Sequence, residues 1–315
     1  APLVVLDWIQ APEVCGNRIK IPLGKKKRHI PLHIPSERPL FSIYLFATMD
    51  SPAYRYVRTL LLLSAGVLSS LPTASASTCE CITINSWTTL RSVVQAALSI
   101  GALGTRPHIL LCPFSITKTD EEAPLELSQQ IFVQCMKDRD GDECTVRGRE
   151  MTGVADDDLR PMVSIGADNV WVQGLTLTGA RGGAVDIAEQ TKGAKLIDMA
   201  IIGNSSPNDR EGSVVDAKWG SLTHVIDTVF SENVGTALQN RGTMMVVSSR
   251  FLDNVATPFF DSSDNIEQGA GVGGAIMNSP GSTMVMNDCC FVGNRAETDG
   301  PAIWSSGNVA EVGGT

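Results

Sequence analysis

The segment MVMNDCCFVGN at residues 284–294 decides the fold, because four earlier segments repeat its pattern of apolar and polar positions. They read VWVQGLTLTGA (170–180), AKLIDMAIIGN (194–204), THVIDTVFSEN (223–233) and MMVVSSRFLDN (244–254). The five segments superimpose on one late apolar residue: Leu177, Ile201, Phe230, Phe251 and Phe291. Self-similarity at intervals of about 20 to 50 residues is typical of proteins whose successive coils stack on each other.

A second short segment follows each of these and also has apolar residues at alternate positions. These segments read GGAVDI, GSVVDA, GTALQN, GGAIMN and GPAIWS. Apolar spacing of two, interrupted by turns, indicates β-strands rather than helices. One coil alone would expose its apolar side chains, whereas coils stacked at about 4.8 Å place equivalent residues in contact. The sequence therefore predicts an all-β fold, a parallel β-solenoid.

An asparagine stands three positions after the late apolar residue in four of the five segments. The column contains Asn204, Asn233, Asn254 and Asn294, and the first segment has Ala180 instead. A turn amide can bond both its own coil and the next, at about 1 kcal/mol per hydrogen bond. We therefore expect an asparagine ladder. Asn204 also begins a sequon, Asn204-Ser205-Ser206, for N-glycosylation. A buried ladder and a glycan at Asn204 exclude each other.

These repeats resemble right-handed parallel β-helix proteins of the pectate-lyase-like architecture. They are most similar to a secreted and surface repeat class whose units read roughly L-x-I-x-N-x-x-F-x-x-N … G-G-A-I. The residues that carry the resemblance in two coils are Met244, Val246, Phe251, Asn254, Gly273, Gly274, Ala275 and Ile276, then Met284, Met286, Asp288, Phe291, Asn294, Gly300, Ala302 and Ile303. The resemblance covers about residues 163–307 and implies the fold. It leaves the function open, because this architecture hosts lyases, hydrolases, adhesins and scaffolds.

The N-terminal part of the chain has the order of a secretory signal peptide. Met49 is the first methionine, a positive stretch follows, and TLLLLSAGVLSSL precedes small residues at Ala74 and Ala76. We predict a signal peptide at 49–76 and regard 1–48 as an upstream segment outside the native protein. The alternative is a basic N-terminal extension with an internal apolar helix. The apolar run is too short for a membrane span, which needs about 20 residues.

Residues 77–315 are expected to form a single β-helix domain that is incomplete at its C-terminal end, because a new coil begins near Val309. The stretch WTTLRSVVQAALSI (87–100) places apolar residues on one helical side. It resembles the helix that caps the first coil of such proteins. The segments 108–114, 130–135 and 144–148 then predict early strands.

Charge and cysteine content indicate the environment. Residues 1–76 hold nine of the 25 Lys+Arg and four of the 34 Asp+Glu, which leaves a balance of −14 for the remainder. An acidic body disfavours a nucleic-acid partner, because phosphates require cationic contacts. Seven cysteines follow residue 76 and can pair in an oxidising compartment. Cys135 with Cys144 is the first predicted disulfide, and Cys112 with Cys79 or Cys81 is the second.

Two sets of acids raise the question of catalysis or metal binding. Asp186 and Asp216 share one column on adjacent coils, and together with Arg181 they would serve a lyase or hydrolase. Asp198, Asp227 and Asp288 share another column, where calcium is one reading and turn stabilisation the preferred one. For the loop at 138–143 the alternatives are a calcium site and, preferred, an acidic loop closed by a disulfide. We therefore expect no resident cofactor, with calcium as the alternative.

The insertion at 255–272 contains candidate binding residues. Phe259 and Phe260 lie beside Asp261 and Asp264, and exposed aromatics next to acids suit contact with a glycan or a protein. The alternative is that both phenylalanines fold back over the coil edge.

The sequence thus favours a secreted or cell-surface β-helix scaffold without catalysis, for adhesion, matrix or glycan binding. Its expected partner is an extracellular glycan or a surface protein. The alternative is a polysaccharide lyase or glycoside hydrolase acting on acidic polysaccharide.

Overall fold

A computed structural model describes residues 81–101, 106–119, 122–136, 143–149, 159–206, 213–256 and 271–311. The predicted upstream segment at 1–48 and the signal peptide at 49–76 lie outside these residues. The described chain consists of one helix and three long sheets of parallel strands. None of its helices is long and apolar enough to cross a membrane.

The strands of sheet A are β1 (His108–Leu111), β4 (Phe132–Cys135), β7 (Trp171–Gln173), β10 (Lys192–Ile197), β13 (Leu222–Ile226), β16 (Thr243–Val247), β20 (Thr283–Asn287) and β24 (Asn308–Glu311). The strands of sheet B are β2 (Phe114–Thr119), β5 (Cys144–Arg149), β8 (Leu175–Thr178), β11 (Ala200–Ile202), β14 (Val229–Ser231), β17 (Arg250–Leu252) and β21 (Cys290–Val292). The strands of sheet C are β3 (Leu125–Leu127), β6 (Val163–Ile165), β9 (Val185–Ile187), β12 (Ser213–Ala217), β15 (Thr236–Asn240), β19 (Ile276–Asn278) and β23 (Ile303–Ser305). A small fourth sheet pairs β18 (Val255–Ala256) with β22 (Arg295–Ala296).

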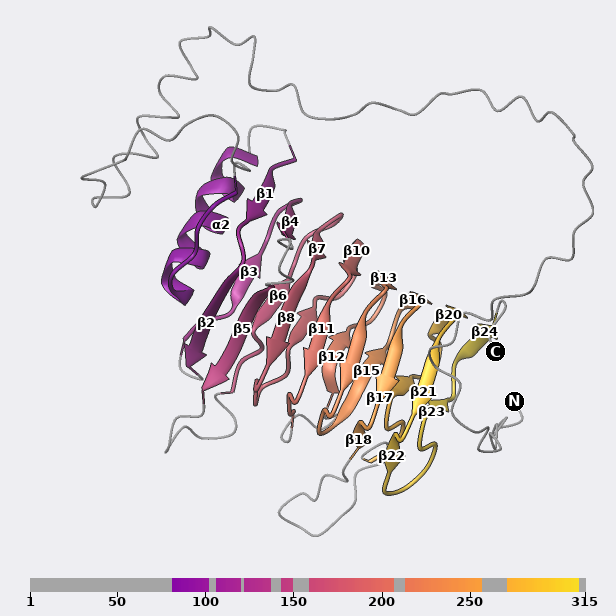
Figure 1. Ribbon diagram of the computed structural model, residues 1–315. Helices are drawn as coiled ribbons and strands as arrows, with labels where there is room; N and C mark the ends of the chain where they lie inside the picture. The colour runs from indigo at the N-terminus through magenta and orange to yellow at the C-terminus, as the bar shows by residue number, and fades with distance from the viewer. Residues whose placement is uncertain are drawn as a thin grey trace, which may run out of the picture. The chain divides into compact units, whose positions relative to one another are not determined.

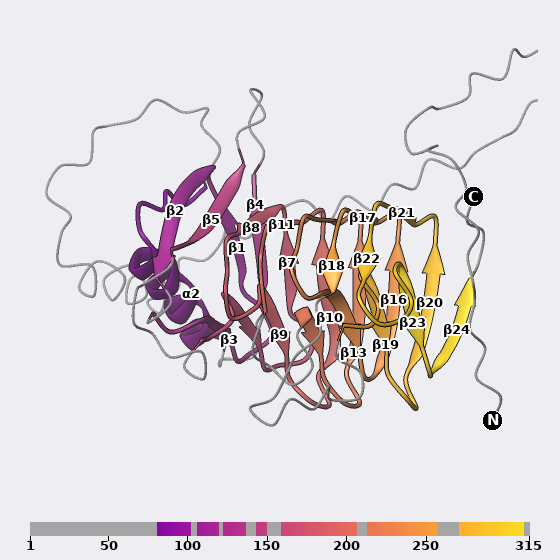
Figure 2. The same ribbon diagram turned by 90° about the horizontal axis from the view of Figure 1, so that it is seen from below.

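Successive strands along the chain go to sheets A, B and C in turn, and each strand pairs with its counterpart one coil away. All the pairings are parallel, so the chain repeats the same path in each coil, as Figure 1 shows between β1 and β24. Figure 2 shows the same row of strands from below. This strand order confirms the predicted all-β class with stacked parallel strands and is compatible with a parallel β-helix.

The register of the coils confirms the alignment read from the repeats. The late apolar residues pair directly, as in Ile201 with Phe230, Phe230 with Phe251, and Phe251 with Phe291. The rings of Phe230 and Phe251 stack with centroids 4.7 Å apart, and those of Phe251 and Phe291 with centroids 5.0 Å apart. Both distances are close to the spacing of neighbouring strands, so like residues pack on like along the core.

Left-handed turns explain the polar columns between sheets A and B. Asp198, Asp227, Ser248 and Asp288 all have φ between 49° and 53°, and Gly174 occupies the same position with φ 75°. Glycine adopts this conformation without strain, and among other residues Asp and Asn tolerate it best. The aspartates of this column therefore stand where the backbone bends from one sheet into the next.

The predicted asparagine ladder is present on the next turn. Asn204, Asn233 and Asn254 have no exposed surface. The Nδ2 of Asn233 donates to the Oδ1 of Asn254 at 2.8 Å, and that of Asn254 donates to the Oδ1 of Asn294 at 2.9 Å. Each Nδ2 also donates to a strand carbonyl of the preceding coil, for example from Asn254 to Phe230 at 3.0 Å. The ladder thus satisfies amides that the core would otherwise leave unpaired.

The single described helix, α2 (Trp87–Gly101), contacts the first strand of each sheet, β1, β2 and β3. The Oγ of Ser86 accepts the backbone N–H of Thr89 at 3.1 Å, which satisfies a free donor of the first turn. Its buried side consists of Trp87, Leu90, Val94 and Leu98. The apolar spacing at 87–100 therefore indicated both the helix and its packed side.

Candidate functional site

The two predicted binding phenylalanines and the acids beside them lie outside the described residues. This applies to Phe259, Phe260, Asp261 and Asp264. They stay a prediction, and the site is built here from the rest of the chain.

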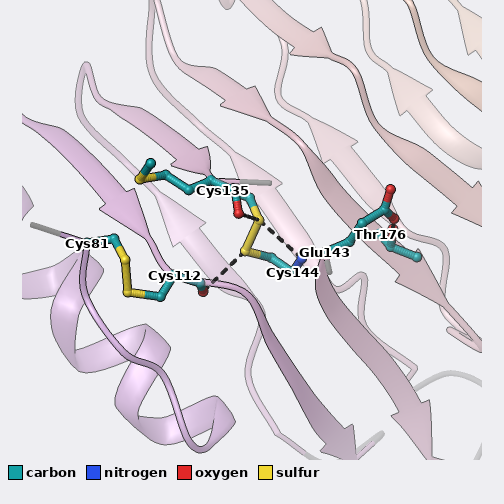
Figure 3. Close-up of a disulfide and its surroundings, with 7 residues drawn as sticks. Cys81, Cys112, Cys135, Glu143, Cys144 and Thr176 are labelled. Atoms are coloured by element: carbon teal, nitrogen blue, oxygen red, sulfur yellow. Dashed lines mark hydrogen bonds between the residues drawn. A yellow bond between two sulfur atoms is a disulfide. The ribbon is translucent and has the colours of Figure 1, made fainter. Parts of the chain in front are cut away.

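Two disulfides lie near each other at the N-terminal end of the stack (Figure 3). One joins Cys135 to Cys144, the pair that the sequence favoured, and the other joins Cys81 to Cys112. Sequence reasoning left Cys79 and Cys81 open as partners of Cys112. The Sγ of Cys144 lies 3.5 Å from the carbonyl oxygen of Cys112, so the two bridges lie side by side on neighbouring coils.

Asp186 and Asp216 occupy directly paired positions on β9 and β12 in sheet C. The carboxylate of Asp186 lies 3.0 Å from the Nζ of Lys218. The carboxylate of Asp216 lies 3.3 Å from the Nη2 of Arg241. Arg241 also donates to the Oε1 of Gln239, the next residue of the column, at 3.3 Å. Each carboxylate of the column therefore has a cation of its own.

The described contacts of these two carboxylates differ from the predicted catalytic set. They involve Lys218 and Arg241, and the predicted set with Arg181 stays a prediction. Toward the C-terminus the column continues from Gln239 to Met277 and Trp304, and toward the N-terminus it continues to Ser164 and then Glu126, so Asp186 and Asp216 are its only directly adjacent acids among the described strands. Two ion-paired carboxylates on adjacent strands can hold the sheet together or bind a polar ligand.

The structure decides between the two exclusive readings of Asn204. Its side chain is fully buried, and its Nδ2 donates to the carbonyl of Leu177 at 2.9 Å and to the Oδ1 of Asn233 at 3.2 Å. Both hydrogens of the amide are used, so a sugar bonded to this nitrogen would break the ladder. In this fold the ladder and a glycan at Asn204 are therefore incompatible, for a steric reason that the sequon alone does not reveal.

The acid column between sheets A and B is a turn feature. Among the described residues, no group of three or more His, Cys, Asp or Glu side chains is arranged to hold a metal ion. Asp198, Asp227 and Asp288 instead have the left-handed backbone described above. The loop at 138–143 lies outside the described residues except for Glu143, which accepts a hydrogen bond from Thr176 at 2.8 Å.

A second group of polar and aromatic side chains lies on the outward face of sheet A. His108, Phe132, Trp171, Lys195 and His224 are paired in register on five consecutive strands. Their neighbours in the strands, such as Ile109 and Val172, point into the core and are buried. Because side chains alternate along a strand, the five residues share the opposite, outward face. We call this row the sheet A ladder.

The rings of the sheet A ladder contact one another and two cations. His108 stacks on Phe132 with centroids 4.3 Å apart, and Phe132 meets Trp171 edge-on at 5.5 Å. The Cζ of Arg106 lies 3.9 Å from the centroid of Trp171, and the Nζ of Lys195 lies 4.1 Å from it. Cations at such distances are attracted by the electron-rich face of an indole.

None of the cations at this face forms an ion pair within the described chain. Arg106 donates from Nη2 to the carbonyl of Asn169 at 3.0 Å, and Lys192 from Nζ to the carbonyl of Gly220 at 2.5 Å. Burial lowers the pKa of Arg106 from its usual value. Burial and then the charge of Lys195 lower the pKa of His224. An acid, Asp168, uses its Oδ1 to accept the backbone N–H of Lys192 at 2.6 Å.

Sequence reasoning identified the strands at 108–114 and 130–135 and missed the ladder. The available signal was an aromatic or histidine residue at the same place in three strands, in HILL, FVQC and WVQ. The first two coils lack the F-x-x-N pattern, so their register with Trp171 was not readable from the repeats.

Comparison with known proteins adds no relative to this picture. No protein-family model matches the chain, and no curated protein matches it significantly.

Proposed function

We propose that this chain is a right-handed parallel β-helix that serves outside the cell as a binding scaffold, for adhesion, matrix or glycan contact, without catalysis. The observation that carries the proposal is the sheet A ladder, a row of rings and cations along one flat face. Aromatic and cationic side chains on an outward face are suited to binding, and a stack of equal coils provides a rigid support for them.

The finer features of the fold belong to the same proposal. Parallel strands joined through a crossover almost always connect with right-handed geometry, which supports the handedness. The contacts of α2 with β1, β2 and β3 support its role as a cap over the first coil. A cap of this kind would prevent other chains from pairing with the open edge strands.

An extracellular location is supported by the bonds between Cys81 and Cys112 and between Cys135 and Cys144. Disulfides of this kind persist in oxidising compartments and are rare in the cytosol. The signal peptide predicted at 49–76 agrees with this location.

A polysaccharide lyase or hydrolase stays the alternative, because Asp186 and Asp216 are direct neighbours and two cations contact them. A cation next to a carboxylate can orient an acidic sugar or stabilise negative charge in a transition state. The direct ion pairs favour the scaffold, since each carboxylate already has a partner.

A panel of polysaccharides, assayed for binding and for turnover with and without calcium, separates the two functions. The scaffold predicts binding without release of shorter or unsaturated products. Turnover that Asp216→Asn abolishes would overturn the proposal in favour of the enzyme. Absence of binding to any glycan on the panel would restrict the scaffold to a protein partner.

A further inference from the structure

The positive charge of Arg106 and Lys195 at the sheet A ladder contrasts with the negative net charge of the whole protein. The chain has a formal net charge of −9. Yet Arg106 and Lys195 each lie against the ring of Trp171, and neither forms an ion pair with a carboxylate in the described chain. The Cζ of Arg106 lies 3.9 Å and the Nζ of Lys195 lies 4.1 Å from the Trp171 centroid, so these two atoms are at most about 8 Å apart. Like charges at this separation repel each other, and a bound anion would offset that repulsion.

The electrostatics of the neighbours show the same excess of positive charge. The charge of Lys195 contributes to the lowered pKa of His224, so this imidazole resists taking up a further proton. Two donors at the same place have no acceptor, the Nε of Arg106 and the Nε1 of Trp171, and both are buried. A buried donor without a partner is unfavourable, because it has lost its hydrogen bond to water. The group thus has donors and positive charge in excess of its acceptors.

The contacts of the rings decide which part of a ligand this face would recognise. His108 lies flat against Phe132, and two cations lie over Trp171. These ring faces are in contact with protein, so a neutral sugar or a nucleic-acid base cannot stack on them without displacing a side chain. What remains available to a ligand is the positive charge of the cations and the amides of the adjacent column, Gln173 and the Nε2 of Gln134, whose Oε1 already contacts the Nε2 of His108 at 3.0 Å.

The extent of the face indicates an elongated ligand. Sheet A continues for eight strands, and the ladder itself spans five of them in register. Since neighbouring strands are about 4.8 Å apart, the ladder is roughly 20 Å long. A single small anion would occupy only the region around Trp171, whereas an extended polymer would follow the strip.

We propose that the sheet A ladder binds an anionic polysaccharide, with Arg106 and Lys195 contacting its carboxylate or sulfate groups. This rests on the proposed binding function and specifies its ligand class and its face. The negative net charge does not prevent binding at physiological salt, because charges more than about 8 Å away are largely screened there. Direct contacts with the two cations are screened much less.

Dextran sulfate and uncharged dextran test the charge requirement on one sugar backbone. Titration calorimetry of the full chain at physiological ionic strength is expected to show binding to dextran sulfate and none to dextran. The affinity should decrease as salt is added, since each cation contact loses strength when counterions compete.

Substitutions then test whether Arg106 and Lys195 form the binding site. Arg106→Gln and Lys195→Gln are each expected to weaken dextran sulfate binding about tenfold, which is about 1.4 kcal/mol, because each removes one charge-assisted contact. Lys195→Arg, which keeps the charge, should retain binding. Arg250→Gln is the matched control, since it removes the same charge from an exposed residue on sheet B and should leave the affinity unchanged. Circular dichroism of every variant shows whether the fold is retained.

Each other outcome overturns a defined part of the proposal. An unchanged affinity in the Arg106→Gln/Lys195→Gln double variant, or an equal loss in Arg250→Gln, would show that the ladder is not the site. Tighter binding of single-stranded DNA than of dextran sulfate would replace the glycan with a nucleic acid. Binding to uncharged glycans alone would refute the anionic ligand and leave the scaffold function intact, whereas polysaccharide turnover would refute the scaffold itself.

Discussion

Sheets A and C both place charged side chains on outward strand positions, and they handle those charges in opposite ways. On sheet C, Asp216 contacts Arg241 and Asp186 contacts Lys218. On sheet A, Lys195 and Arg106 lie over the ring of Trp171 and pair with no acid among the described residues. Charges that neutralise each other within the chain are available to stabilise the fold. Cations held on an aromatic ring keep their charge available to a ligand.

Removing one partner from the sheet C pairs should produce the largest effect on stability. The side chains of Arg241 and Asp216 are only 15% and 12% exposed. Asp216→Ala would leave Arg241 without this carboxylate in a nearly dry position, and we expect a loss of about 3 kcal/mol in the free energy of unfolding. Urea denaturation measures it.

Asp186→Ala is the matched control for that experiment. Its pair with Lys218 is more exposed, at 37% for the lysine and 26% for the aspartate. Ion pairs that water reaches contribute little, so the loss should stay below about 1 kcal/mol. Equal losses at the two positions would remove the distinction between the buried and the exposed pair.

On sheet A, replacement of the ring should cost less than loss of the buried ion pair. Trp171 is half-buried, so Trp171→Ala is expected to lower the free energy of unfolding by about 2 kcal/mol, less than the 3–5 kcal/mol of a fully buried ring. Trp219→Ala, at a turn residue that is 46% exposed, should change it by at most about 0.5 kcal/mol. Thermal and urea unfolding measure both. A Trp171 variant as stable as the Trp219 variant would mean that the ladder contributes nothing to packing.

The protonation of His224 should make the face of sheet A sensitive to pH. Its pKa in the fold is lowered, by burial first and Lys195 second. Below about pH 6.5 the unfolded chain takes up this proton more readily than the folded chain does. The free energy of unfolding should therefore be highest above about pH 6.5 and decrease as the pH falls below that value. In His224→Gln the midpoint of urea unfolding should depend less on pH over this range. If the midpoint depends on pH as strongly as in the unmodified protein, other groups cause the effect.

The smallest expected effect is a shift of one titration. Lys195→Gln removes a charge that lowers the pKa of His224, so this pKa should rise toward its ordinary value. NMR titration of the imidazole proton resonances measures it. Lys192→Gln is the control, because its ammonium contacts the carbonyl of Gly220 and does not act on His224. Equal shifts in both variants would contradict the placement of Lys195 beside the imidazole.

The stacking of the coils could be predicted from the sequence over long distances. Phe251 and Phe291 are 40 positions apart and pair directly. The residues on which the alignment was built pair in the same way in sheet C, as Val215 does with Leu238. A solenoid makes this possible because equivalent positions of neighbouring coils are spatial neighbours whatever the loop length between them.

The partners of the charged side chains could not be predicted in the same way. Lys218 and Arg241 contact Asp186 and Asp216 in the structure, and the repeat pattern named neither cation. Both cations follow the sheet C strands directly, at the turn toward sheet A. Whether a long side chain reaches back to a carboxylate depends on the backbone angles of that turn, which a repeat pattern does not specify.

The sequence by itself determined how the coils of this protein stack, including the strands, their register and the asparagine ladder. Equivalent residues one coil apart satisfy one another's packing and hydrogen bonds. Only the tertiary structure decided what lies side by side on the outward faces, including the contact of Arg106 with Trp171 and those of Lys218 and Arg241 with the sheet C carboxylates. These contacts join residues of different columns, and their geometry follows from turn conformation and side-chain rotamers rather than from the repeat.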